Sequence, residues 1–145
     1  MKAVIQRVKN ASVTIEGNLY SSIDAGMLIL FCVEKADTHD MLEWMANKVV
    51  SLRCFEDDNC KMNKSIKDVN GEILVVSQFT LAADCKKGTR PSFDNAESPD
   101  KANSMYERFV ELLSQQGITV KTGKFAAMMD VSLVNDGPVT FVLTK

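Results

Sequence analysis

The residues best suited to chemistry in this chain are polar groups at the end of an apolar, strand-like run. The segment Ser77-Gln78-Phe79-Thr80 follows directly on Ile73–Val76. A strand that ends in a loop frees backbone N–H groups, and such groups can hold the oxyanion of an acyl-transfer reaction. The alternative, which the local pattern alone favours, is a strand terminus whose polar side chains satisfy its own backbone.

A second polar segment, Asn135-Asp136-Gly137-Pro138, lies between two strand-like runs. Asn-Asp-Gly is an ordinary hairpin signal, and a proline would stop the ladder of the strand that follows. Only about one X-Pro bond in twenty is cis in folded proteins, so the sequence alone does not predict a cis peptide. Taken by itself, the segment predicts a turn.

The sequence excludes several familiar kinds of catalytic site. It has no Gly-rich phosphate loop, no GxSxG motif and no dinucleotide fingerprint. Its one histidine, His39, falls in the exposed first turn of an expected helix, so no imidazole is available to activate a nucleophile. The four cysteines form no CxxC pair, and we expect reduced thiols, no metal and no cofactor. A hydrolase of this sequence must rely on positioning, on backbone amides or on a group that the substrate brings.

The elements that must position these residues are expected to form one sheet and two helices. The first helix begins after Asp37 or Thr38; the second begins at Ser98-Pro99, with serine as N-cap, and ends at Gly117. The strand-like runs are Ala3–Val8, Ala11–Ile15, Leu19–Ile23, Met27–Val33, Ile73–Val76, Met129–Val134 and Val139–Leu143. Together they predict one α+β domain over residues 1–145, with a mostly antiparallel, barrel-like sheet and two packing helices.

Charge and hydropathy predict a cytoplasmic protein. The longest apolar run, Met27–Val33, is too short to span a bilayer, and the first residues carry charge where a signal peptide needs apolar ones. The net charge of −2 does not indicate a nucleic-acid binder. Positive charge is nevertheless concentrated in two loops, where solvated lysines are the simpler interpretation: Lys61, Lys64 and Lys67 in one, and Lys86, Lys87 and Arg90 in the other.

Nearly end to end, the chain resembles the D-aminoacyl-tRNA deacylase family, also called the D-tyrosyl-tRNA deacylases. Several distinct blocks occur in the same order, which is far more specific than one short motif. The blocks are Ala3–Val8, Lys61–Asn63, Gly71–Ala83, Gly88–Phe93 and Ser132–Phe141. Cys32 and Cys60 depart from the glycines expected at their positions, but neither lies in a motif.

The resemblance implies a homodimer whose two active sites lie at the subunit interface. It implies that the Gly137-Pro138 peptide is cis and enters the partner's pocket, where its carbonyls leave no room for an L side chain. Arg7 resembles the family arginine that braces this motif. The implied substrates are D-aminoacyl-tRNA and glycyl-tRNA mischarged on tRNA(Ala), because glycine has no side chain to exclude.

The same resemblance assigns roles to the first segment. Backbone amides near Phe79 and Thr80 would stabilise the oxyanion, while Ser77 and Gln78 place the substrate. Thr80 is one candidate nucleophile, but we favour the 2′-OH of the terminal adenosine, or a water that it orients, because no evident base lies near Thr80.

Two groups complete the expected tRNA site. Ala102 and Phe125 would line the adenosine end of the pocket, although Phe125 is equally suited to the core. Contacts from Lys86, Lys87 and Arg90 to phosphates are our own inference. The alternatives are a non-enzymatic, dimeric nucleic-acid-binding module on the same fold and a general serine or threonine esterase; we expect no membrane partner.

Overall fold

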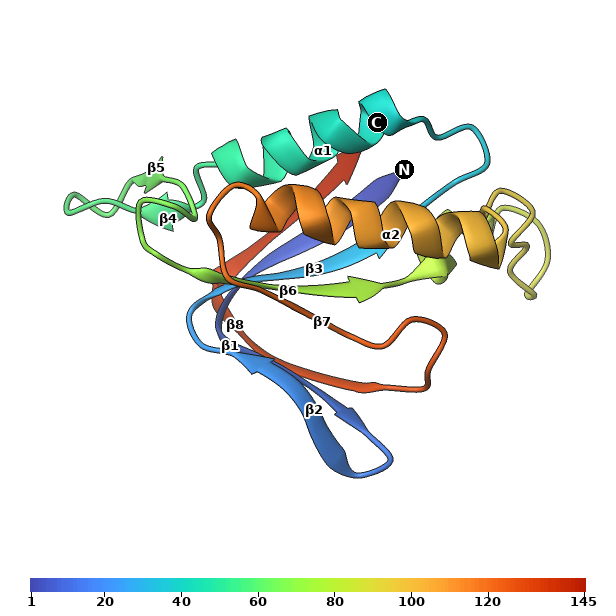
Figure 1. Ribbon diagram of the computed structural model, residues 1–145, viewed down its shortest axis with the longest axis horizontal. Helices are drawn as coiled ribbons and strands as arrows, with labels where there is room; N and C mark the ends of the chain where they lie inside the picture. The colour runs from blue at the N-terminus through green and yellow to red at the C-terminus, as the bar shows by residue number, and fades with distance from the viewer.

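A computed structural model describes all of residues 1–145, and its centre is a six-stranded mixed sheet that curls toward a barrel (Figure 1). The strands of this sheet are β1 (Lys2–Ile15), β2 (Asn18–Ile23), β3 (Gly26–Cys32), β6 (Glu72–Ser77), β7 (Val120–Thr122) and β8 (Asp130–Thr144). The helices are α1 (His39–Ser51), α2 (Pro99–Ser114) and the short 3-10 helix η1 (Phe79–Ala82). The strands β4 (Phe55–Glu56) and β5 (Met62–Lys64) form a separate ribbon.

The strand order explains the barrel-like shape. The sheet runs β2-β1-β3-β6-β7, and β8 pairs with β1 as well. The long strand β1 is antiparallel to β2, β3 and β8, whereas β6 is parallel to both β3 and β7. The hydroxyl of Ser21 in β2 donates to the carbonyl oxygen of Thr122 in β7 over 2.8 Å, which brings the two edges together. The predicted fold class is therefore confirmed, with two parallel pairs in the sheet.

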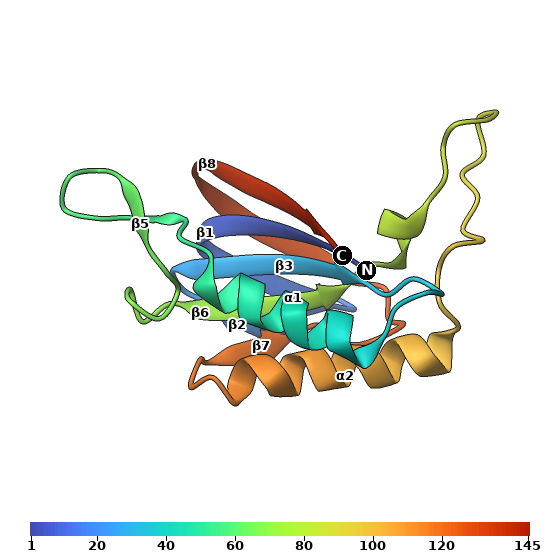
Figure 2. The same cartoon turned by 90° about the horizontal axis from the view of Figure 1, so that it is seen from above.

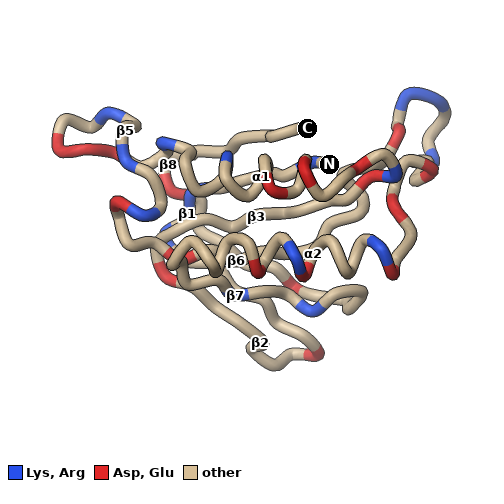
Figure 3. Tube along the Cα trace, turned by 45° about the horizontal axis from the view of Figure 1, so that its top comes forward, with Lys and Arg blue, Asp and Glu red and all other residues tan.

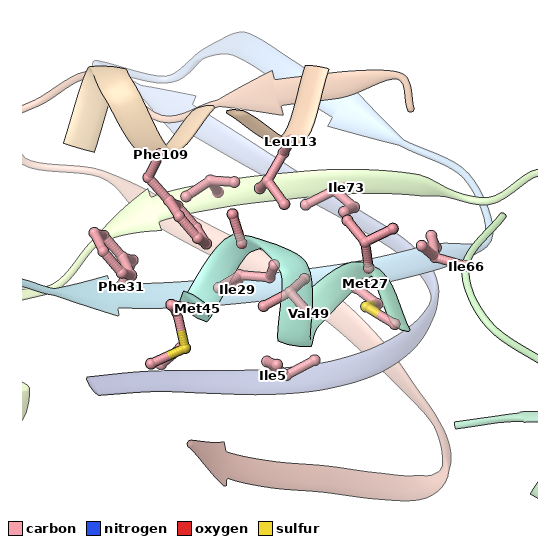
Figure 4. Close-up of a cluster of buried hydrophobic side chains, with 14 of the residues drawn as sticks. Ile5, Met27, Ile29, Phe31, Met45, Val49, Ile66, Ile73, Phe109 and Leu113 are labelled. Carbon is pink, nitrogen blue, oxygen red and sulfur yellow. The ribbon is translucent and has the colours of Figure 1, made fainter. Parts of the chain in front are cut away.

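The two helices cover one face of the sheet, as Figure 2 shows from above. The rings of Phe31 in β3 and Phe109 in α2 stack with their centroids 4.2 Å apart. Met45 and Val49 of α1 pack beside them over Ile29 (Figure 4). This core fixes the ends of β3, β6 and α2 relative to one another, and the end of β6 is where the polar segment begins. Neither helix has the length and apolar character needed to cross a membrane.

The helix starts differ in part from the sequence prediction. Thr38 caps α1, since its hydroxyl oxygen accepts from the Met41 N–H over 3.4 Å. Pro99 is the first residue of α2 as predicted, but the Ser98 side chain makes no capping bond. The Glu97 carboxylate instead accepts from the Ser98 N–H over 2.8 Å, because it lies just outside the helix and is drawn to the N-terminal end.

The predicted turn at Asn135–Pro138 is wrong. The two expected final strands are one strand, β8, which runs along β1 and bulges. Asn135 pairs with Val8 and Thr140 with Gln6, so residues 136–139 lie opposite the single residue Arg7. The Asn135 side-chain oxygen accepts from the Val139 N–H over 2.7 Å, which replaces a missing ladder bond and lets the chain continue without reversing. The runs Ala3–Val8 and Ala11–Ile15 are likewise one strand, β1.

Candidate active site

A pocket of about 560 Å³ opens where β6 ends, between η1, the start of α2 and the segment that precedes β8. Most of its walls are hydrophobic, and its polar groups are few, which is typical of a small-molecule site. Its polar side chains are those of Ser77, Gln78, Glu97 and Tyr106. Its apolar walls include Phe79, Ala102, Phe125 and Met128.

The turn after β6 places backbone donors at this pocket. The Gln78 N–H still bonds to the Phe31 carbonyl over 2.8 Å, as an extension of the parallel sheet. The chain then enters η1, whose bonds run from the N–H of Leu81 to Gln78 and from that of Ala83 to Thr80. Phe79 and Thr80 are the first residues of η1, so their N–H groups have no partner within the turn. Two such donors side by side can hold an oxyanion.

No group in the pocket is suited to activate Thr80 as a nucleophile. Its hydroxyl oxygen accepts from the Gln78 side-chain amide over 2.5 Å, and an amide is not a base. Glu97 is the only carboxylate of the pocket, and the Lys101 ammonium 2.6 Å away lowers its pKa. Burial raises the pKa of the Tyr106 phenol, which donates to the Val75 carbonyl over 2.8 Å and therefore stays a neutral structural donor.

The adenosine-end candidates both reach the pocket. Ala102, in the first part of α2, contributes a small side chain, and Phe125 contributes an aromatic ring from the segment after β7. The ring centroids of Phe125 and Tyr106 are 6.0 Å apart, and Phe125 also packs against the buried core. Both roles considered for Phe125, pocket wall and core, are thus present in the geometry.

Arg7, Gly137 and Pro138 form a second group. Arg7 is only 5% exposed, and its Nε donates to the Asp136 carbonyl over 2.9 Å while Nη1 donates to the Cys54 carbonyl over 2.8 Å. The Gly137–Pro138 peptide bond is cis, and Gly137 has φ of +138°. The bulge of β8 is therefore fixed by its own Asn135 on one side and by Arg7 on the other.

The two groups do not meet within one chain. Neither Gly137 nor Pro138 lines the pocket. The bend of β8 lies at the opposite end of the sheet from η1 in both ribbon views (Figures 1 and 2). The chain thus carries a pocket and a projecting bulge as separate features.

The basic candidates Lys86, Lys87 and Arg90 lie in the long loop that follows η1. All three are exposed and none forms an ion pair. Figure 3 shows blue segments along this loop, well away from those near β5. They lie outside the pocket lining.

Sequence reasoning missed several pocket residues. Cys32 was expected to be an ordinary buried apolar residue, yet it borders the pocket. Met128, which is 92% exposed, sits at the pocket's edge in a segment without helical or strand periodicity. Only the juxtaposition of β3, β6 and the segment before β8 reveals them, and no local pattern in the sequence encodes it.

Fold and site together define a class: a barrel-like α+β protein whose pocket offers backbone amides, a few polar side chains and no histidine, as an ester hydrolase without a catalytic histidine would. The chain belongs to the D-Tyr-tRNA(Tyr) deacylase family, whose profile matches residues 4–144. The resemblance drawn from the sequence blocks is therefore confirmed, and the protein is a hydrolase of that family.

Relatives match over nearly the whole length. The D-aminoacyl-tRNA deacylase of Thermotoga petrophila is 56% identical over 143 residues, covering 99% of this chain and 96% of the relative. That of Exiguobacterium sibiricum is 56% identical over 145 residues, covering all of both chains.

Among solved structures, a c-Myc DNA unwinding element binding protein superposes with a TM-score of 0.94 at 43% identity, covering 100% of this chain and 99% of the other. A probable eukaryotic D-amino acid tRNA deacylase superposes with a TM-score of 0.84 at 16% identity, covering 98% and 97%, and supports the fold alone.

Proposed function

We propose that the protein hydrolyses the ester that joins a D-amino acid, or glycine, to tRNA, and that residues 1–145 act as one deacylase domain in the cytoplasm. The observation that carries the proposal is the η1 turn, which begins at a mostly apolar pocket: Phe79 lines the pocket, and Thr80 follows it in the turn, outside the lining. The amides of Phe79 and Thr80 stabilise the tetrahedral oxyanion as the ester carbonyl is attacked. Ser77 and Gln78 place the substrate, and Ala102 and Phe125 hold its adenosine.

The chiral filter comes from a second copy of the chain. The β8 bulge, which contains Gly137 and Pro138, lies at the other end of the sheet from η1, and neither residue lines the pocket. Only a partner's bulge can therefore reach the site, and the enzyme acts as a homodimer with two composite sites. The exposed apolar side chains of Val134 and Val142 on β8 suit such an interface.

Selection then works by exclusion: peptide carbonyls occupy the space that an L side chain needs, and D side chains point elsewhere. We therefore expect glycyl-tRNA(Ala) to be hydrolysed while L-alanyl-tRNA(Ala) is spared by about 100-fold or more, although the two differ by one methyl group. Parallel deacylation assays on the two esters measure this ratio. Equal rates would show that the site does not sense the L side chain.

The attacking group is the 2′-OH of the terminal adenosine, or a water that it orients, rather than Thr80. The Thr80→Ala variant is therefore expected to keep kcat within about threefold of the parent, since an unactivated hydroxyl is a poor nucleophile. Single-turnover deacylation of D-Tyr-tRNA tests this, with Thr80→Ser as the matched control. A collapse of kcat in Thr80→Ala, with KM unchanged and Thr80→Ser active, would restore Thr80 as the nucleophile.

Lys86, Lys87 and Arg90 contact phosphates of the tRNA. Replacing all three by glutamine is expected to reduce the slope of log affinity against log salt by about two, because each lost contact removes most of one released counterion. The control replaces Lys61, Lys64 and Lys67, which carry the same charge near β5. If both triple variants keep the parent's slope, the loop after η1 does not touch tRNA.

The alternative is a dimeric nucleic-acid-binding module without catalysis, and one structural relative is named for DNA binding. The net charge of −2 and a mostly apolar pocket that contains no basic side chain favour an enzyme that grips only the acceptor end. A general esterase is tested separately, because it would cleave simple nitrophenyl esters.

A further inference from the structure

Lys2, the first residue of β1, holds the η1 turn from the side of the sheet. Its ammonium nitrogen lies 3.0 Å from the carbonyl oxygen of Leu81 in η1 and 3.0 Å from Oε1 of Glu34. The Glu34 carboxylate also lies 3.4 Å from the Met1 α-ammonium, through Oε2. Lys2 and Glu34 are 30% and 20% exposed, so the pair is partly shielded from water. A residue 79 positions away in the chain thus bonds to the backbone of the turn.

The contact between Lys2 and Leu81 lies near the C-terminal end of η1, where it can affect the whole turn. A 3-10 helix leaves its last carbonyls without partners inside the helix, and a lysine near that end satisfies them and opposes the negative end of the peptide dipoles. Leu81 is near the C-terminal end of η1, while Phe79 and Thr80 carry the free N–H groups at the other end. Fixing the Leu81 carbonyl therefore fixes the orientation of the whole turn, including its donors.

A second contact holds the start of the turn. The sulfur of Cys32, the cross-strand partner of Lys2, lies 3.7 Å from the Phe79 carbonyl oxygen. Burial raises the pKa of this thiol to about 11, so it remains a neutral S–H donor at physiological pH. The Cys32 contact is weak, whereas the Lys2 contact carries a full charge.

We propose that Lys2 is a positioning residue for deacylation, which caps the Leu81 carbonyl and so aims the amides of Phe79 and Thr80 at the developing oxyanion. This rests on the proposed role of η1. Lys2 does not touch the substrate; it acts through the turn. Lys2 therefore stabilises the transition state and does not contribute to substrate binding.

Steady-state and single-turnover deacylation of D-Tyr-tRNA by the full-length protein tests the proposal with three variants. Lys2→Met removes the donor and keeps the length of the side chain; it is expected to lower kcat about tenfold with KM within about twofold of the parent. Lys2→Arg is expected to recover most of the rate. Lys48→Met, an exposed lysine on α1, is the matched control and is expected to match the parent.

A parent-level kcat in Lys2→Met overturns the proposal, as does a loss that Lys2→Arg does not rescue. Glu34→Gln provides a second variant in case Lys2→Met folds poorly. A kcat about threefold lower than that of the parent supports the positioning role of Lys2, and an unchanged kcat contradicts it. If the parent protein leaves D-Tyr-tRNA intact, the proposed function itself fails. If the parent is active and Lys2→Met deacylates as fast as the parent, this inference alone fails.

Discussion

Replacing Arg7 by methionine is expected to destabilise the fold by about 3 kcal/mol and to let the enzyme hydrolyse L-aminoacyl-tRNA. Arg7 is almost fully buried and donates to two carbonyls, those of Asp136 in the β8 bulge and Cys54 outside it. Its loss leaves both carbonyls without a donor. For a chain of this length the Tm should fall by about 10 °C, which thermal unfolding followed by circular dichroism measures.

The effect on selectivity shows whether Arg7 holds the bulge in the geometry that excludes L substrates or only stabilises the fold. The ratio of D-Tyr-tRNA to L-Tyr-tRNA hydrolysis should fall in Arg7→Met at a temperature where the variant is still folded. Lys9→Met, which removes an exposed charge from the same strand, should keep both the Tm and the ratio. An Arg7→Met protein with a lower Tm and an unchanged ratio would mean that Arg7 supports the fold but not the filter.

The Gly137→Ala variant is expected to lose about 10- to 100-fold in D-Tyr-tRNA deacylation. At φ of +138° an L side chain is strained. A Cβ at this position would also lie 2.6 Å from the Val139 Cγ2 atom, 3.0 Å from the Val139 nitrogen and 3.1 Å from Nη2 of Arg7. The bulge must therefore shift, and it would no longer match the partner's pocket.

Gly17→Ala is the matched control for this substitution. Gly17 also has a positive φ, of +77°, but a Cβ there meets nothing within 4 Å, and the residue lies in the turn between β1 and β2. It should lose about 1 kcal/mol of stability and no activity. Deacylation by Gly137→Ala at the parent's rate and selectivity would contradict the role of the bulge.

Much of the fold could be predicted because its patterns are local. The continuous apolar run from Met27 matches β3, which is buried among its neighbours, and Pro99 begins α2 as its fixed φ favours. The β8 bulge could not be predicted from the local pattern, because the residue types Asn-Asp-Gly-Pro are typical of a turn. Contacts with the rest of the sheet prevent a turn here. β1 is long enough to pair with both halves of β8, and Arg7 fills the gap in the ladder of hydrogen bonds.

In the candidate site, too, some features could be predicted from the sequence and others could not. The end of a strand at Ser77–Thr80 could be predicted from the sequence, whereas the catalytic role proposed for this segment comes from the family resemblance. The contact of Lys2 could not be predicted, since a lysine at the start of a strand gives no sign that it will bond to Leu81, 79 residues away. The family resemblance implied that Gly137–Pro138 serves a partner's pocket, and in the structure neither residue lines the pocket of its own chain.

Deacylation of matched D-Tyr-tRNA and L-Tyr-tRNA by the purified protein tests the central claim most directly. Rapid loss of the D ester with the L ester untouched is the predicted result, since the η1 amides supply the chemistry and the Gly137–Pro138 bulge supplies the exclusion. Loss of both esters would contradict the filter, and loss of neither would contradict the enzyme.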